Sequence, residues 1–126
     1  MKSLLLTYNL DPATEARLRA LCGRMMIDVR AVPAEAYGEA IGALAGLPEA
    51  RPAASGPALG FSDPMIVMCG LLAPQFNALL EAMRAQGVRV ALKCVLTPTN
   101  AGWNSIQLRD ELSREHEAMR RAREGS

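Results

Sequence analysis

The apolar residues predict two successive strand-helix-strand units. In the first unit, residues 4–32, a short apolar strand precedes a helix that starts at Asp11, and an alternating strand follows. Residues 65–96 repeat this order, with a helix that starts near Ala73. A shift of 62 positions superposes Leu4 on Ile66, Leu10 on Leu72, Pro12 on Pro74 and Leu18 on Leu80. The match predicts an internal duplication, with convergent patterning as the alternative.

The predicted strands differ in how their apolar residues are spaced. The first and third are apolar on every residue, whereas the second alternates with Asp28 and Arg30 and the fourth with Arg89 and Lys93. Continuously apolar strands are buried on both faces, so the first and third belong in the centre of a sheet. We expect an α+β fold and favour a ferredoxin-like sandwich ordered 4-1-3-2, which two similar units form by pseudo-twofold pairing. An open parallel α/β sheet ordered 2-1-3-4 fits the same pattern.

The length of the chain corresponds to a single domain, residues 1–126. Its halves, residues 1–47 and 64–126, are joined by residues 48–63, which are rich in Pro, Ala and Gly and predict a surface linker. Residues 33–47 predict a helix with Gly38, Gly42 and Gly46 on one stripe. Each glycine costs a helix about 1 kcal/mol relative to Ala. We therefore interpret the stripe as an interface, within the fold or in a homodimer, with ligand contact as the alternative.

Composition and charge exclude several classes of protein. Half of the residues are hydrophobic, and 14 Lys and Arg residues nearly balance 13 Asp and Glu residues, which argues against disorder and against nucleic-acid binding. The N-terminus lacks the apolar core of a signal peptide, and the longest apolar stretch, residues 65–73, is too short to span a membrane. We expect a cytoplasmic protein. Cys22, Cys69 and Cys94 lie far apart in apolar segments and predict buried free thiols, without a metal site or a cofactor.

The stretch LKCVLTPTNAGWN, residues 92–104, combines structural and chemical signals. Pro98 favours a sharp end to the strand, and Asn104 with Gln107 predicts a capping box at the start of the last helix. A second interpretation is a ligand site at the mouth of this helix. An ammonium group, hydroxyl groups and free backbone amides are a usual combination for binding phosphate or carboxylate. Its candidate residues are Lys93, Thr97, Thr99, Asn100 and Trp103.

The last helix, running from Ser105 towards Ala122, carries two candidate general bases. His116 is the only histidine of the chain, and Glu111 lies five residues before it. A packed or solvated histidine explains the same residue. Because no nucleophile or metal motif accompanies either side chain, an enzyme is the less favoured interpretation.

Three segments resemble a bacterial family catalogued only as a domain of unknown function. They read DPMIVMCGL, LKCVLTPTNAGWN and LRDELSREHE. The residues that match the signature of this family are Lys93, Thr97, Pro98, Thr99, Asn100, Trp103, Glu111 and His116. The first half is similar to longer members through Tyr37-Gly38, Ile41-Gly42 and Leu44-Ala45-Gly46. The resemblance implies no activity, cofactor or substrate.

We therefore favour a small cytoplasmic binding or regulatory module with an anion or small-ligand site at residues 93–103. Its expected partners are an anionic small molecule or a second copy of the chain, and neither a membrane nor a nucleic acid. Two alternatives remain open, a protein–protein interaction module and an enzyme that uses His116 or Glu111 as a general base.

Overall fold

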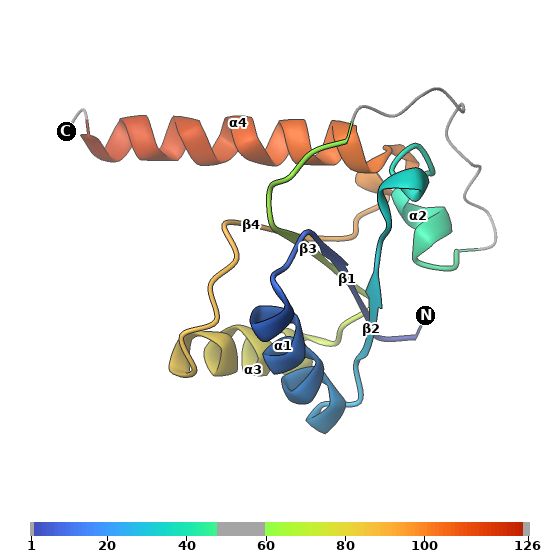
Figure 1. Cartoon of the computed structure of the whole chain (residues 1–126), viewed down its shortest axis with the longest axis vertical. Helices are drawn as coiled ribbons and strands as arrows, with labels where there is room; N and C mark the ends of the chain where they lie inside the picture. Colours follow the sequence, from blue (N-terminus) through green and yellow to red (C-terminus); the bar gives the residue numbers. More distant parts are fainter. Residues whose placement is uncertain (1, 48–59, 125–126) are drawn as a thin grey trace.

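A computed structural model describes residues 2–47 and 60–124, in which four strands form one sheet ordered β2-β1-β3-β4 (Figure 1). The central strands β1 (Leu4–Tyr8) and β3 (Met65–Cys69) are antiparallel, and all their side chains are buried. β2 (Asp28–Ala31) is parallel to β1, and β4 (Leu92–Val95) is parallel to β3. The prediction of which strands are central and which are edges is therefore confirmed.

The α+β class is confirmed, but the favoured strand order is not. The ferredoxin-like order 4-1-3-2 would place each edge strand beside the central strand of the other half, whereas each edge strand lies beside the central strand of its own half. The observed order 2-1-3-4 is that of the alternative, although the sheet is mixed because β1 and β3 run in opposite directions. Both orders bury the first and third strands, so apolar spacing could not distinguish them.

Two helices cover one face of the sheet. α1 (Pro12–Arg24) is capped by Asp11, whose carboxylate accepts a hydrogen bond from the Thr14 N–H at 2.6 Å. α3 (Ala73–Ala85) occupies the equivalent place in the second half. Both helices pack on the same sheet face, and the buried core between them and the sheet includes Leu5, Leu18, Cys22, Ile66, Met68, Leu79 and Met83.

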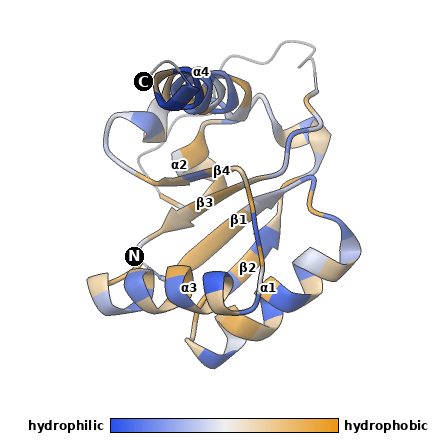
Figure 2. Ribbon diagram, turned by 90° about the vertical axis from the view of Figure 1, so that its left-hand side faces the viewer, coloured by the Kyte–Doolittle hydropathy of each residue, from blue (hydrophilic) through white to orange (hydrophobic). Residues whose placement is uncertain are grey.

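The other face is covered by a longer helix and a short one. α4 (Ser105–Glu124) and α2 (Ile41–Leu44) contribute Leu108, Ile41 and Leu44 to a second core with β1 and β3. Only the first turns of α4 contain buried residues, and its C-terminal half extends beyond the sheet (Figure 1). Figure 2 shows that α4 is mostly hydrophilic, in contrast to the hydrophobic central strands. In the described part of the chain, no helix is both long and apolar enough to cross a membrane.

The predicted glycine-striped helix over residues 33–47 is wrong. The segment contains a single 3-10 turn, η1 (Ala34–Ala36), followed by the short α2. Gly38 lies between the two, and Gly46 follows α2 with a φ of 86°. A regular helix does not form here because Tyr37 is buried in the core and Ala40 pairs with Asn104, the residue before α4. An interface role for Gly38, Gly42 and Gly46 stays a prediction, without the shared stripe that suggested it.

The predicted linker lies largely outside the described residues, but its last residues are fixed to the core. Phe61 stacks on Tyr37 with 4.5 Å between ring centroids and also contacts Tyr8. The Asn9 side-chain amide donates to the backbone carbonyls of Phe61 and Asp63 at 2.9 and 3.2 Å. This end of the segment is therefore part of the packed structure, which its Pro, Ala and Gly content did not predict.

The two halves share their backbone geometry at a spacing of 61 residues. β1 and α1 correspond to β3 and α3 at this spacing, and Leu18 and Leu79 are the equivalent fully buried leucines. The positive φ angles also correspond, with Asn9 matching Gly70 and Met26 matching Gly87. The expected shift of 62 positions was one residue too long. It aligned Pro12 with Pro74, but Pro12 is the first residue of α1 whereas Pro74 is the second residue of α3. Common origin of the halves stays a prediction.

Met26 occupies a backbone conformation that its glycine counterpart adopts without strain. Its φ is 60°, that of Gly87 is 68°, and the Met26 side chain is 85% exposed. We expect Met26→Gly to raise the free energy of unfolding by about 1 kcal/mol, because the left-handed region disfavours residues with a Cβ atom. Urea denaturation measures this change. Met26→Ala, which keeps the Cβ atom, should leave stability nearly unchanged, and an equal gain in both variants would contradict the explanation.

The free thiols of Cys22 and Cys69 are buried as predicted, whereas Cys94 is half-buried, and together they predict a loss of stability at alkaline pH. Burial raises the pKa of Cys22 to about 11 and those of Cys69 and Cys94 to about 12, from an ordinary value of 9.0. Above pH 9 the unfolded chain has released protons that the folded chain still binds, so the free energy of unfolding should fall between about pH 9 and 12. Urea denaturation across this window tests the trend. Replacing the three cysteines with alanine should reduce the slope without abolishing it, because burial also raises the pKa of the Tyr8 and Tyr37 hydroxyls, and an unchanged slope would exclude the thiols as a source.

Candidate functional site

The loop between β4 and α4 is held together by its own side chains. Asn100 is buried, and its side-chain oxygen accepts from the Thr97 N–H at 2.8 Å while its side-chain nitrogen donates to the Val95 carbonyl at 3.0 Å. The Thr97 hydroxyl accepts in return from the Asn100 N–H at 3.1 Å. Thr99 is exposed. Two of the predicted ligand residues therefore already have their polar side-chain atoms engaged in forming the turn.

Most backbone donors at the start of α4 are engaged as well. The Ser105 N–H donates to the Tyr37 carbonyl at 3.1 Å, and the Leu108 N–H donates to the Asn104 carbonyl at 3.1 Å. Asn104 and Gln107 exchange reciprocal bonds of 2.9 and 2.8 Å, so the predicted capping box is present. The helix terminus thus has little donor capacity left for an anion. The shared ligand role of residues 93, 97, 99, 100 and 103 stays a prediction.

Lys93 lies away from this loop and lines a groove at the edge of the sheet. Leu92 and Cys94 face the core under α4, so Lys93 projects from the opposite face of β4, as its alternation with apolar residues predicts. The Lys93 ammonium group donates to the Val90 carbonyl at 2.9 Å. The groove has a volume of about 900 Å³, and His116 of α4 forms part of its wall.

The groove combines an apolar surface with basic side chains. Its apolar lining comes from the C-terminal half of α3, the chain leading into β4 and the residue before β3: Leu80, Met83, Val88, Val90, Ala91 and Pro64. Arg84, Arg89, Lys93 and His116 add the polar part. Among the residues that the structure describes, no acidic side chain lines the groove, and neither arginine nor Lys93 forms an ion pair. Its positive charge is therefore not neutralised by any side chain in residues 2–47 and 60–124.

Sequence reasoning identified part of this groove. Lys93 was a predicted ligand residue and His116 a candidate base, but nothing along the chain indicated that they would line one cavity. Arg84 was missed because a basic residue in the last turn of a helix is explained by the helix dipole alone. Arg89 carried the better signal, since it alternates with the apolar Val88 and Val90, although it lies before β4 and these valines pack in the other core from Leu92 and Cys94.

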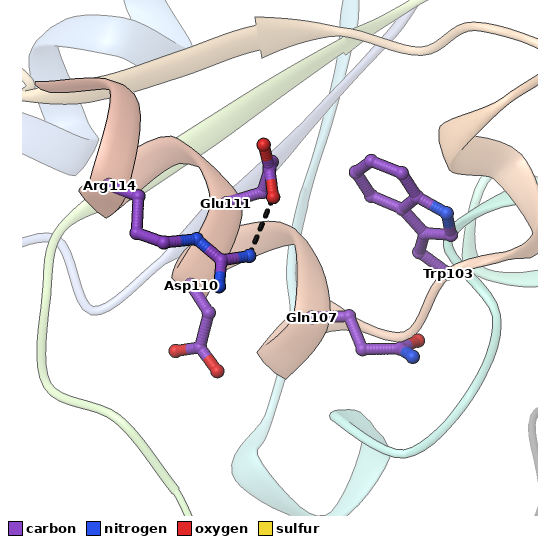
Figure 3. Close-up of a pocket in the computed structure, with 5 residues that line it drawn as sticks. All are labelled: Trp103, Gln107, Asp110, Glu111 and Arg114. Carbon is purple, nitrogen blue, oxygen red and sulfur yellow. Dashed lines mark hydrogen bonds and ion pairs between the residues drawn. The ribbon is translucent and has the colours of Figure 1, made fainter. Parts of the chain in front are cut away.

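A second, smaller cavity lies between Trp103 and the N-terminal half of α4 (Figure 3). Trp103, Gln107, Asp110, Glu111 and Arg114 line its volume of about 280 Å³. The Arg114 guanidinium donates to the Glu111 carboxylate at 2.6 Å. Trp103 therefore belongs to a different cavity from Lys93, and the predicted ligand residues do not converge on one site.

The structure also separates the two candidate general bases. Glu111 lines the small cavity and His116 the groove, and five residues of helix place their side chains about 140° apart around α4. Cys94 packs under α4, where burial first and the Glu115 charge second raise its thiol pKa to about 12. Within residues 2–47 and 60–124, no group of three or more His, Cys, Asp and Glu residues could hold a metal ion.

Comparison with known proteins identifies one family. Residues 64–119 match the model of a family described as a domain of unknown function, DUF3783. The expected resemblance to an uncharacterised family is thus confirmed for the second half, which contains β3, α3, β4 and most of α4. The matches noted in residues 37–46 lie outside this range. No curated protein and no solved structure matches the chain.

The bonding of Asn100 predicts that it stabilises the fold. We expect Asn100→Ala to lower the free energy of unfolding by about 2 kcal/mol, because the Val95 carbonyl and the Thr97 N–H would lose their partner. Chemical denaturation measures the loss. The exposed neighbour Thr99→Ala is the matched control and should change stability by less than about 0.5 kcal/mol. Equal effects of the two substitutions would show that Asn100 has no special structural role.

Proposed function

We propose that this protein is a small binding module whose groove between α3, β4 and α4 takes an anionic ligand with an apolar part. The observation that carries the proposal is the composition of the groove, in which apolar residues lie beside basic side chains and no acidic side chain from the described part of the chain opposes them. Its volume of about 900 Å³ is within the range of small-molecule sites, about 300–1,000 Å³.

The charges of the groove support an anionic group on the ligand. Arg84 and Arg89 are exposed and form no ion pair within the described residues, so a bound carboxylate or phosphate would be their first charged partner. Lys93 currently donates to a backbone carbonyl, a neutral acceptor that a negatively charged oxygen would outcompete. A basic surface without local neutralisation also attracts anions from a distance.

The apolar residues support a hydrocarbon or ring portion on the ligand. Leu80 is half-buried and Pro64 and Ala91 are exposed along the groove, so these residues offer the apolar surface, while Met83, Val88 and Val90, at most 6% exposed, lie beneath it. Transfer of an apolar group from water to such a surface is favourable by about 25 cal/mol per Å² buried. A purely inorganic anion would leave this surface unused, so we propose an amphipathic organic anion.

This proposal retains part of the sequence-based hypothesis and changes the rest. Lys93 keeps its role as a charge for an anion, whereas Thr97 and Asn100 act in the turn and Trp103 lies in the other cavity. His116 supplies a polar side chain on the α4 wall, which we propose serves ligand contact rather than catalysis. Binding without turnover requires no nucleophile, and this is consistent with the placement of the cysteine thiols away from the groove lining.

Titration calorimetry with decanoate, below its micelle-forming concentration, tests the proposal. We expect saturable binding that is weakened about tenfold or more in the double variant Arg89→Gln/Lys93→Gln, because a charge-assisted hydrogen bond contributes about 1.5–3 kcal/mol. Inorganic phosphate and 1-decanol should each bind more weakly than decanoate, because phosphate lacks the apolar chain and 1-decanol lacks the negative charge.

Removal of one positive charge outside the groove is the control. Arg17→Gln alters one exposed arginine on α1 that does not line the cavity, and it should leave decanoate binding unchanged. Equal weakening in Arg17→Gln and in the double variant would show a general charge effect. Decanoate binding that is unaffected by the double variant, or no binding up to about 10 mM, would contradict the proposed function.

A further inference from the structure

We propose that the small cavity beside Trp103 binds a guanidinium group, presented by an arginine side chain of a partner segment. The cavity of about 280 Å³ is the size of a single side chain rather than of a larger ligand. It lies between Trp103 and the N-terminal half of α4, and none of its lining residues is shared with the basic groove. The inference is therefore independent of the proposed function.

The indole of Trp103 is a fixed platform for a flat cation. Its backbone is held on both sides, because the Trp103 N–H donates to the Asn100 carbonyl at 3.0 Å and its carbonyl accepts from the Ile41 N–H at 2.8 Å. The side chain is half-buried against the core that contains Leu108. A guanidinium group stacks on an indole face through cation–π attraction, and a platform that is already ordered loses little entropy when it binds.

Glu111 provides the charge that such a cation requires. Its carboxylate lies beside the indole in the cavity and already accepts a hydrogen bond from Arg114 at 2.6 Å (Figure 3). This contact demonstrates that a guanidinium group can reach the carboxylate. Asp110 is a second acid at the cavity, but it pairs at 2.8 Å with Arg109, which is only 32% exposed and also bound to Asp63, whereas the partner of Glu111 is largely exposed. Glu111 is therefore the main anionic contact of the proposed site.

The resident Arg114 is easy to displace. Its side chain is 73% exposed, and an ion pair exposed in this way contributes little stability, which screening by salt reduces further. An incoming arginine would gain the indole face in addition to the carboxylate, whereas Arg114 gains the carboxylate from the same helix three residues away. Arg114 thus acts as an internal competitor for the site, and its removal should strengthen binding.

Trp103 is the only tryptophan of the chain, so its fluorescence reports on this cavity directly. We expect N-acetyl-arginine amide to change the Trp103 emission in a saturable way, with a Kd of about 1–10 mM for this minimal probe. Arg114→Ala should lower the Kd several-fold, and Glu111→Gln should raise it about tenfold or more. The exposed acid Glu35→Gln is the matched control and should leave the Kd unchanged.

Two further measurements make a negative result decisive. N-acetyl-lysine amide separates a guanidinium site from a general cation site, and the NMR signal of the single indole N–H detects binding that leaves emission unchanged. Equal responses to the lysine and arginine probes, retention of binding in Glu111→Gln, or no response of emission or indole signal up to about 50 mM probe would each overturn the proposal. Circular dichroism confirms that the variants, which change exposed or half-buried side chains, remain folded.

Discussion

The antiparallel pairing of β1 with β3 is the constraint on which the rest of the structure depends. Five residue pairs, from Leu4 opposite Cys69 to Tyr8 opposite Met65, join the halves through strands that are buried on both faces. Strands of this kind must be covered on both faces of the sheet. Each half of the chain supplies one helix, α1 or α3, to the same face. The opposite face is then left to α2 and α4, which connect to it through Tyr8 and its 2.8 Å hydrogen bond to Ser105.

This pairing also determines where the grooves form. Because β1 and β3 occupy the central positions, β2 and β4 are the edge strands, and they lie at opposite edges of the sheet. α4 begins over the core and extends past β4, while α3 ends near the same edge. The basic groove lies between these elements. Its position is thus a consequence of sheet order, and a ferredoxin-like order would have brought a different strand to this edge.

The sequence predicted best those features that depend on local physical chemistry. Continuous apolar residues identified the central strands, and Asn104 with Gln107 identified the start of α4, because burial and capping leave a direct record in residue spacing. Strand order was not predictable in this way, since Leu5 and Ile66 are buried in either topology. The glycines at every fourth position in residues 38–46 resembled a helical stripe. The backbone there is instead determined by the pairing of Ala40 with Asn104, more than 60 residues away.

The candidate site depends still more on tertiary structure. Lys93, Arg89 and Arg84 come from a strand, the segment before it and a helix, and only the crossover between α3 and β4 brings them to one groove. Asn100 and Trp103 are two positions of the same loop signature, yet one closes the turn and the other lines a separate cavity. A linear motif therefore combined residues with different structural roles, and the geometry assigns those roles individually.

The most direct test of the central claim is a map of amide chemical shifts by ¹H–¹⁵N correlation NMR during a decanoate titration. We expect progressive shifts confined to the groove, namely residues 80–93 and the region of His116 on α4, while the signals of the turn at Asn100 and of the Trp103 indole stay unchanged. Shifts centred on residues 97–103, or spread evenly over the surface without saturation, would contradict the central claim.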